Sequence, residues 1–382
     1  MPVRDLIIVG AGPSGLSAAI ASKQRGLDYQ VIEQGALVNS IYHFPPQMVF
    51  FTTPELLEIG GLPFVSPYEK PTRAEALRYY RKVVDAYDLQ ITFDETVLSV
   101  ALEPEEPRDW QDKVLFAVET RSTRGVRRVR HARNVVLAVG YYDHPNLLGV
   151  PGEDLPHVHH YYGESHPYYR QRVVVVGGGN SAAESALELH RAGAHVTLVH
   201  RWSELKSTIK YWVKPDIENR IKEGSIAARF NTCVTEIRPT SIIVTRGRES
   251  TLEAEGQRSA ASARGWGPAR SNESQSTLEA EGERSAASAR EWGPARSQED
   301  ELPADTVFLL TGYHPDYDLL TRAGVSLNDR GVPAYDADTF ETNVGGLFVA
   351  GGVISGKDTA PIFIENGRFH GEKIVEVISA RR

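Results

Sequence analysis

The sequence predicts an α/β fold with two Rossmann-like dinucleotide-binding domains, and three observations support this prediction. A short apolar run followed by a glycine-rich turn and a helical pattern occurs twice, once from residue 6 and again from residue 173. Strand-like and helical stretches alternate around both copies, as expected of parallel sheets with crossover helices. The length of 382 residues exceeds one ordinary core and suits two domains.

The first copy has all the parts of a dinucleotide fingerprint. Its turn consists of Gly10, Ala11, Gly12, Pro13, Ser14 and Gly15. Gly10 permits the tight bend, Gly12 lets the backbone approach a diphosphate, and Gly15 lets the helix pack closely on the strand. The next strand, residues 29–32, ends at Glu33, where the fingerprint places an acid that accepts a hydrogen bond from a ribose hydroxyl. This segment therefore predicts a dinucleotide site.

The second copy has the opposite charge at the end of its second strand. Its turn consists of Gly177, Gly178, Gly179, Asn180, Ser181 and Ala182, in which alanine replaces the third glycine, as the fingerprint allows. His200 and Arg201 stand where the first copy has Glu33. A guanidinium binds a 2′-phosphate bidentately, whereas a carboxylate would repel it. We expect this site to prefer NADP(H) over NAD(H); the alternative is a surface arginine at a strand end.

Two dinucleotide sites in one chain suggest one dinucleotide that stays bound and one that exchanges. FAD and NADPH fit these roles, because hydride can pass from the nicotinamide to the flavin without a third group. The protein then has to hold the donor and acceptor atoms about 3–3.5 Å apart in a dry site.

The composition narrows the function classes. The formal charge of −8 offers no basic excess for phosphate contacts, which argues against a nucleic-acid partner. The single cysteine, Cys233, excludes an internal disulfide, a Cys-x-x-Cys redox pair and an iron–sulfur site. No apolar run reaches the ~18–20 residues of a membrane span, and no secretion signal is visible. We therefore expect a soluble, cytoplasmic protein.

Later segments add a resemblance to a group of flavoproteins. Residues 135–140 look like the strand and glycine turn that leave an FAD domain, and residues 307–313 look like the exit from an NADP domain. Residues 347–352, after Thr342, resemble the closing flavin motif. With the two glycine turns, these segments resemble the two-dinucleotide flavoproteins of the thioredoxin-reductase-like type. Gly352 replaces the aspartate usual in that motif, so the resemblance implies that the hydrogen bond from that acid to the flavin ribityl chain comes from elsewhere.

A second set of tracts is more specific. It comprises Ser40-Ile41-Tyr42, Phe50-Phe51, Ile59-Gly60, Leu62-Pro63-Phe64, Gly140-Tyr141-Tyr142, His166-Pro167-Tyr168, Gly312-Tyr313-His314-Pro315-Asp316-Tyr317 and Ile362-Phe363-Ile364-Glu365-Asn366-Gly367. These tracts resemble the bacillithiol-disulfide reductase family over nearly the whole chain outside one insertion. Members use FAD and NADPH to reduce the disulfide of bacillithiol, a glucosaminyl malate that carries a cysteine, alongside bacilliredoxins. The resemblance implies a homo-oligomeric enzyme that reduces a small disulfide, with bacilliredoxin or another small redox protein as a partner.

The resemblance also implies the residues of both cofactor sites. For FAD they are the first glycine turn with Glu33, and then Gln34, Ser40, Tyr42, Phe51, Thr52, Val97, Ala138, Gly140, Gly351 and Ile362. For NADPH they are Gly177, Gly179, Asn180, Ser181, Arg201, Lys206, Thr311 and Gly312.

One departure from this family concerns sulfur. Many members carry a cysteine in the first glycine turn, where this chain has Ser14, and a hydroxyl cannot form a mixed disulfide. Cys233 lies in a strand-like stretch of the second domain, where we expect it to be buried and inert. Reduced flavin would then attack the substrate sulfur directly, and a nearby acid would protonate the leaving thiolate. Candidate donors are His43, Tyr42 and His166, for each of which packing or FAD contact is the alternative role.

Two clusters of charged or titratable residues could have a functional role or could simply face solvent. One consists of His157, His159, His160 and His166, which lack an acid or cysteine to complete a metal geometry, so no metal site is predicted. The other consists of Lys206, Lys210 and Lys214, which would share one face if their segment is helical. Either that face is solvated, or Lys206 contacts an NADPH phosphate and Lys210 contacts an anionic thiol substrate.

The chain order implies a discontinuous FAD-binding domain. We expect it to comprise residues 1–150 and 313–382, with an NADP-binding domain of residues 151–312 inserted between them. An internal repeat interrupts the second domain between residues 248 and 299. Each copy of the repeat has one Leu and one Trp, which is too little apolar surface to offset the entropy of ordering it. We predict a flexible surface loop there.

Three other functions remain open from the sequence. A cysteine-less ferredoxin or flavodoxin NADP reductase has a related fold, although the acidic net charge counts against docking an acidic ferredoxin. A flavin monooxygenase also pairs two glycine fingerprints, and its aromatic–Gly–His linker pattern is approached by Tyr161, Gly163 and His166 with a spacing one residue short. A non-enzymatic NADPH sensor would require the flavin to be absent or unreactive.

Overall fold

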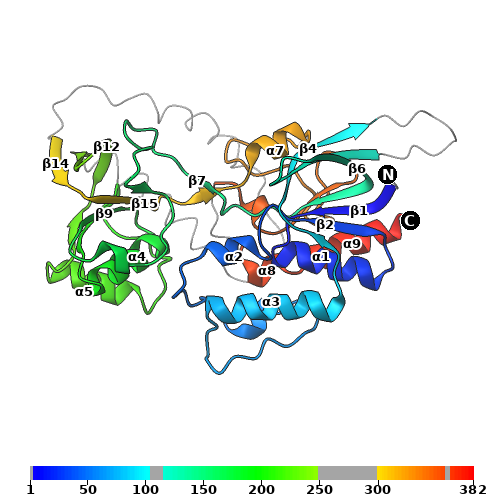
Figure 1. The fold of residues 1–382 in the computed structure, drawn as a ribbon, viewed down its shortest axis with the longest axis horizontal. Helices are drawn as coiled ribbons and strands as arrows, with labels where there is room; N and C mark the ends of the chain where they lie inside the picture. Colours follow the sequence, from blue (N-terminus) through cyan, green and yellow to red (C-terminus); the bar gives the residue numbers. More distant parts are fainter. Residues whose placement is uncertain (1–2, 104–114, 248–298, 358–361) are drawn as a thin grey trace, which may run out of the picture. The chain divides into compact units, whose positions relative to one another are not determined.

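The chain divides into two compact units. The computed structural model describes residues 3–103, 115–247, 299–357 and 362–382 (Figure 1). The first unit combines residues 1–146 and 312–382, and the second unit is formed by residues 147–311. Residues 147–150 therefore belong to the second unit and Gly312 to the first, which differs from the sequence-based boundaries at these positions.

The first unit is built on a seven-stranded sheet. In spatial order its strands are β3 (Ile91–Thr92), β2 (Tyr29–Ile32), β1 (Val3–Val9), β6 (Arg127–Leu137), β5 (Leu115–Ser122) and β4 (Glu95–Glu103), with β17 (Leu347–Val349) paired to β6. The strands β1, β2, β3, β6 and β17 run parallel, with Ile8 opposite both Val31 and Val136. The strands β4, β5 and β6 form an antiparallel meander. The carboxyl ends of β1, β2 and β6 meet at one edge, where ligands bind in such sheets.

Both faces of this sheet are covered, which explains the unbroken apolar run in β1. Leu6 and Ile8 pack into one buried cluster, and Ile7 and Val9 pack into another on the opposite face. Helices α1, α3 and α9 supply side chains to the cluster around Leu6 and Ile8. These three helices lie on the same side of the sheet in Figure 1. The helices of the unit are α1 (Pro13–Gln24), α2 (Asn39–His43), α3 (Arg73–Tyr87), α7 (Tyr317–Arg322), α8 (Ile364–Gly367) and α9 (His370–Ala380), with 3-10 turns η1 (Pro54–Leu57) and η3 (Gly351–Ser355). A short ladder pairs β7 (His144–Pro145) with β16 (Tyr313–His314).

The second unit has its own parallel sheet and core. The sheet order is β11 (Ala227–Arg229), β10 (His195–Val199), β9 (Arg172–Val176), β15 (Thr306–Leu309) and β8 (Val158–His159). An antiparallel sheet of β12 (Thr232–Arg238), β13 (Ser241–Arg246) and β14 (Glu299–Pro303) packs with it. The helices in the described part of this unit are α4 (Asn180–Arg191) and α5 (Lys214–Lys222), and η2 (His166–Tyr168) is a 3-10 turn. The apolar face of α4 packs on Val173 and Val175 of β9.

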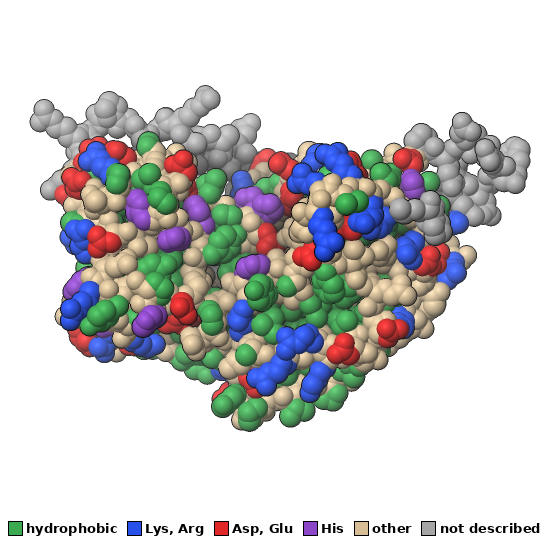
Figure 2. All heavy atoms as spheres, viewed as in Figure 1, with side chains coloured by type: hydrophobic (Ala, Val, Ile, Leu, Met, Phe, Trp, Pro, Cys, Tyr) green, Lys and Arg blue, Asp and Glu red, His purple; other side chains and the backbone are tan. Residues whose placement is uncertain are grey.

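The surface carries mixed charge. On the face drawn in Figure 2, basic and acidic side chains are interspersed, in keeping with 42 Lys and Arg against 50 Asp and Glu in the chain. Across the described ranges, no helix combines the length and the apolar character needed to span a bilayer.

The repeat insertion lies outside the described residues, except for its last position. Glu299, which the sequence-based boundary placed in the insertion, is the first residue of β14. The strands β13 and β14 are antiparallel neighbours, with Thr245 opposite Glu299. The two chain ends that flank residues 248–298 are therefore adjacent in space.

We expect the protein to tolerate replacement of residues 248–298 by a short Asn-Gly turn. The pairing of Thr245 with Glu299 already sets the two strands at hairpin distance, and Arg246, Gly247 and the new Asn-Gly would form a four-residue loop, a common length for hairpins. Flavin absorbance of the purified variant and its steady-state turnover should both match those of the intact chain. Loss of either property would show that the segment is structural.

Candidate functional site

The first glycine turn forms a backbone cradle at the end of β1. Gly10 has a φ of +104°, and a Cβ there would lie 2.5 Å from the carbonyl oxygen of Ala138. A Cβ at Gly15 would lie 2.0 Å from the carbonyl oxygen of Gly10. Both neighbours are backbone atoms, so only glycine fits at these positions. At Gly12, by contrast, a Cβ would meet no described atom within 4 Å, and the open space above that backbone fits a diphosphate.

Glu33 is tied directly to this turn. Its carboxylate accepts hydrogen bonds from the backbone N–H of Ala11 at 2.7 Å and of Gly35 at 2.9 Å. The side chain is buried, and burial raises the pKa of Glu33 while the two backbone bonds lower it. Each carboxylate oxygen keeps a second lone pair, which a ribose hydroxyl can use. The residues of the turn and Glu33 together fit the diphosphate and ribose of a dinucleotide.

The C-terminal segments of the first unit close over the same turn. A Cβ at Gly367 of α8 would lie 3.2 Å from the Ser14 Oγ and 3.2 Å from the Gly351 Cα, so these three residues pack together. Gly351 has a φ of +73°, and its N–H donates to the Nδ1 of His370 at 3.1 Å. Ser14 thus lies at the centre of the cradle.

Gly352 is covered by an aromatic ring. A Cβ at this position would lie 2.6 Å from the Cδ1 of Tyr141. Burial raises the pKa of Tyr141 to about 12, with a further contribution from the charge of Glu365, so its phenol stays protonated at neutral pH. The ring fills the space that an aspartate at position 352 would need.

His370 makes the cradle sensitive to acid. Burial lowers the pKa of His370 from 6.5 to about 4, so the native state holds the ring neutral while the unfolded chain takes up a proton near pH 6.5. The contribution of His370 to stability is therefore constant above that pH and falls as the pH drops from about 6.5 to about 4, by ~3 kcal/mol at most. Protonation would also remove the acceptor for the Gly351 N–H.

We predict that a His370→Gln variant shows a flatter stability curve between pH 6.5 and pH 4 than the unmodified protein. Thermal unfolding of both proteins across this range measures the difference directly. Equal slopes for the two proteins would contradict the prediction.

The other FAD-site residues named from the sequence lie in the first unit. Ser40, Tyr42 and His43 belong to α2. The start of this helix is held beside the glycine turn, because the N–H of Val38 donates to the carbonyl oxygen of Ala11. Tyr42 is 51% exposed and Phe51 is 54% exposed, so both rings leave apolar surface accessible. The remaining members, all in this unit, are Gln34, Thr52, Val97, Ala138, Gly140 and Ile362.

His43 has one ring nitrogen fixed by the backbone. Its Nδ1 lies 2.9 Å from the carbonyl oxygen of Asn39, and because a carbonyl only accepts, this nitrogen carries a hydrogen. Burial raises the pKa of Asp143, and the nearby charges of His144 and then His43 lower it by less. Asp143 also accepts a 2.8 Å hydrogen bond from the Nε2 of Gln34. Asp143 was not singled out from the sequence, because it lies in a loop with no motif of its own.

The second glycine turn repeats the cradle in the second unit. Gly177 has a φ of +153°, and a Cβ there would lie 2.5 Å from the carbonyl oxygen of Leu310. The ring of His200 packs against Gly178, and the stem of Lys206 lies over Gly179. The N–H of Lys206 donates to the carbonyl oxygen of Gly178 at 2.9 Å. The turn therefore fits a second diphosphate, with a lysine beside it.

A positive charge stands at the end of β10. Arg201 is exposed and its guanidinium lies 5.0 Å from the ring centre of Trp202. The neighbouring His200 is buried; burial, then the charges of Arg201 and Lys206, lower the pKa of His200 to about 4. Because His200 is neutral at physiological pH, Arg201 and Lys206 are the cations at this strand end that can meet a phosphate.

The expectation for Lys210 was wrong. Residues 206–213 are not helical, because α5 begins only at Lys214. Lys210 is buried with its Nζ 2.5 Å from an oxygen of Glu184, and its N–H donates to the Oδ1 of Asn180 at 2.8 Å. The side-chain amide of Asn180 in turn donates to the carbonyl oxygen of Thr208. Lys210 thus stabilises residues 206–210 beside the second turn and does not form a surface rim for a thiol substrate.

His166, Thr311 and Cys233 belong to the second unit, and Gly312 to the first. His166 is exposed at the start of η2. Cys233 is half-buried in β12, and burial raises the pKa of its thiol although the charge of Arg201 lowers it. Among the residues that the structure describes, no three His, Cys, Asp or Glu side chains gather as metal ligands would.

Comparison with known proteins defines the class. The sequence matches the family described as pyridine nucleotide-disulphide oxidoreductase over residues 7–291 and 289–351, and the chain belongs to this family. It is 37% identical over 376 residues to bacilliredoxin reductase Bdr of Bacillus subtilis (strain 168), covering 98% of this chain and 97% of that protein. The bacillithiol disulfide reductases Bdr of Bacillus cereus and Staphylococcus aureus have solved structures that match over 100% of both chains. Their TM-scores are 0.83 and 0.80 at 35% and 34% identity.

Within that family the chain is a member of the Bdr group of bacillithiol-disulfide reductases, as the sequence tracts indicated. The predicted fold class, two Rossmann-like domains of the thioredoxin-reductase-like type, is confirmed. The chain is an oxidoreductase with FAD and NADPH as its cofactors. The two glycine cradles described above fit these two dinucleotides.

Proposed function

We propose that this enzyme reduces bacillithiol disulfide with electrons from NADPH. One NADPH and one proton convert one disulfide into two thiols and release NADP⁺. Bound FAD supplies the connecting chemistry, because it accepts hydride from NADPH and gives two electrons to a disulfide. The proposal is supported by the activity that the names of the Bdr relatives carry and by the two cradles of this chain.

The single observation that carries the direct route is the placement of sulfur. The chain has one cysteine, so it cannot form an internal dithiol. Cys233 is half-buried in the second unit, and its raised pKa disfavours the reactive thiolate. Ser14 packs against Gly351 and Gly367 in the first cradle, where a hydroxyl cannot form a mixed disulfide. The electrons therefore reach the substrate without a protein sulfur.

The leaving thiolate needs a proton, and we assign this role to His43. Its Nδ1–H is held by the carbonyl oxygen of Asn39, which leaves Nε2 as the nitrogen that exchanges a proton. Tyr42 packs edge-on against the His43 ring, with 5.0 Å between ring centres, and serves as the second candidate donor. His166 remains the third.

The protein partner, the oligomeric state and the cellular compartment belong to the same proposal. We expect the product thiol to serve bacilliredoxin or another small redox protein, and we expect the enzyme to work as a homo-oligomer in the cytoplasm. The coarser statement, an enzyme that acts on a small-molecule substrate, follows from membership of the Bdr group.

An anaerobic experiment tests the proposed acceptor. The flavoprotein is reduced with one equivalent of NADPH and then offered bacillithiol disulfide, ferredoxin or oxygen in separate mixtures. Return of the oxidised flavin absorbance should be fastest with bacillithiol disulfide. Fastest return with ferredoxin or with oxygen would instead identify a carrier reductase or an oxygen-using enzyme.

A further inference from the structure

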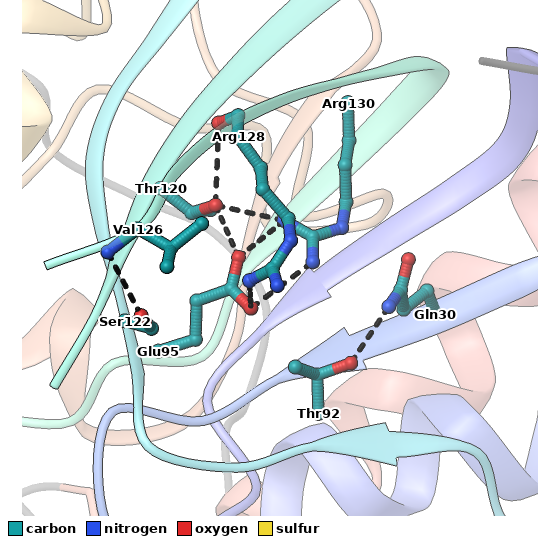
Figure 3. Close-up of polar contacts among 8 residues, drawn as sticks. All are labelled: Gln30, Thr92, Glu95, Thr120, Ser122, Val126, Arg128 and Arg130. Atoms are coloured by element: carbon teal, nitrogen blue, oxygen red, sulfur yellow. Dashed lines mark hydrogen bonds and ion pairs between the residues drawn. The ribbon is translucent and has the colours of Figure 1, made fainter. Parts of the chain in front are cut away.

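A buried ionic cluster lies in the meander of the first unit (Figure 3). Glu95 is the first residue of β4 and is 1% exposed. Its carboxylate binds Arg130 of β6 through two contacts, Oε1 to Nη1 at 2.5 Å and Oε2 to Nη2 at 3.0 Å. Thr120 of β5 donates to the same carboxylate and accepts from the Nη1 of Arg130 at 2.7 Å. Arg128 approaches the outer side, with its Nη1 3.3 Å from Oε2.

Stability alone does not explain why charged side chains are buried in this cluster. Burial raises the pKa of Glu95, but the hydrogen bonds from Arg130 and Thr120 and the charge of Arg130 hold it below its usual value, so the carboxylate is ionised at neutral pH. Removing two charges from water is costly, and a buried ion pair often stabilises a fold no better than apolar side chains of the same size. What a bidentate pair adds is a fixed geometry. The question is which neighbouring group that geometry serves.

The backbone of Glu95 points to Glu33. The N–H of Glu95 donates to the carbonyl oxygen of Glu33 at 3.0 Å, and the N–H of Glu33 donates to the carbonyl oxygen of Thr92 at 2.8 Å. Thr92 is held in turn by the side-chain amide of Gln30, which donates to its Oγ1 at 2.7 Å (Figure 3). Both backbone polar groups of Glu33 are therefore held by the segment from Thr92 to Glu95. The ionic cluster holds the end of that segment from the side of the meander.

We propose that the Glu95–Arg130 pair is a positioning device for Glu33, and through it for the adenosine half of FAD. The inference rests on the proposed role of Glu33 as the acid that accepts from the ribose. The chain of contacts runs from Arg130 and Thr120 to the Glu95 carboxylate, from the Glu95 N–H to Glu33, and from the Glu33 carboxylate to the N–H of Ala11 in the glycine turn. Neither member of the pair needs to touch the cofactor.

The test replaces both charges with apolar side chains. The double variant Glu95→Met/Arg130→Met leaves no unpaired buried charge, and we expect it to fold but to bind FAD at least tenfold more weakly. Titration of the apoprotein with FAD, followed by quenching of flavin fluorescence, gives the dissociation constant. The matched control is Glu119→Gln/Arg127→Gln, an exposed pair on the same meander at 2.9 Å, which should leave FAD affinity unchanged. Unchanged FAD affinity in the buried double variant would overturn the inference.

A thermodynamic cycle separates positioning from a general loss of structure. Glu33→Gln is combined with the buried double variant, and FAD affinity is measured for all members of the cycle. If the pair acts through Glu33, its removal should change FAD affinity less than threefold once Glu33 has been replaced. If the combined variant instead loses FAD affinity by the product of the losses in Glu33→Gln and in the buried double variant, the cluster acts independently of Glu33. That result would contradict the inference.

Two further measurements distinguish a positioning role from misfolding of the variants. Arg130→Lys keeps the charge but loses the bidentate fork, and we expect it to weaken FAD binding about threefold even if the double variant misfolds. Affinity for 2′,5′-ADP at the second unit should stay the same in every variant that folds. Normal FAD affinity in Glu33→Gln would refute the assigned role of Glu33 itself, whereas a defect in Glu33→Gln but none in the pair variants would refute only the positioning role.

Discussion

A Gly15→Ala variant should be purified without FAD and should not regain it when FAD is added. The new Cβ would lie 2.0 Å from the carbonyl oxygen of Gly10, and neither atom can move without opening the turn between β1 and α1. Overpacking of this kind costs about 1–3 kcal/mol of stability when side chains give way, and here the neighbour is backbone. We expect FAD affinity to fall more than 100-fold, as measured by absorbance near 450 nm after purification and by fluorescence titration.

Two other glycines serve as controls for this prediction. A Cβ at Gly12 would meet no described atom within 4 Å, so Gly12→Ala should fold as the unmodified protein does and yet bind FAD poorly, because the methyl group occupies the place of the diphosphate. Gly345 is equally unobstructed but lies away from both turns, and Gly345→Ala should keep full FAD content. Normal FAD content in Gly15→Ala would mean that this turn is not the FAD cradle.

The second large effect concerns the choice of nicotinamide cofactor. Arg201→Ala should lower kcat/KM for NADPH about 10–100-fold, since a hydrogen bond to a charged group contributes ~1.5–3 kcal/mol. Turnover with NADH should change less than twofold, because NADH has no 2′-phosphate for the guanidinium to bind. Steady-state rates with both cofactors, at several salt concentrations, measure the change in preference.

Arg238→Ala is the matched control for the loss of a cation in the same unit. Arg238 is exposed on β12 and pairs with Glu236 at 2.9 Å, so its removal should leave both cofactor rates unchanged. An equal loss of rate with NADPH and NADH in Arg201→Ala would refute the assignment of Arg201 to the 2′-phosphate.

The parts of the site that the sequence could predict are those encoded by local patterns. Gly10, Gly12, Gly15 and Glu33 follow one another through a strand, a turn and a second strand, and backbone geometry alone assigns their roles. The opposite charge of Arg201 could be seen for the same reason, by comparing two copies of one unit. Their contacts with FAD and NADPH stay predictions until a liganded form is measured.

The rest of the site depends on tertiary contacts that no local pattern encodes. Tyr141 lies over Gly352, and His370 accepts from Gly351. Tyr141 belongs to one of the tracts named from the sequence, but nothing in that tract places its ring on Gly352, and His370 comes from a segment without a motif. Glu95 is a strand residue whose partner Arg130 is brought to it by the register of the meander. The lysine spacing was misleading because hydrogen bonds to the second turn hold residues 206–210 in an irregular segment that contains a turn, so the periodicity of a helix does not apply.

The central claim, that electrons pass from flavin to the substrate disulfide without a protein thiol, is tested most directly by the turnover of a Cys233→Ser variant. The rate is measured anaerobically with saturating NADPH and bacillithiol disulfide, and the thiols released are counted against NADPH consumed. We predict a kcat within twofold of the unmodified enzyme and two thiols for each NADPH. A kcat reduced 100-fold or more, with FAD content intact, would show that the sulfur of residue 233 takes part in the reaction and would contradict this account.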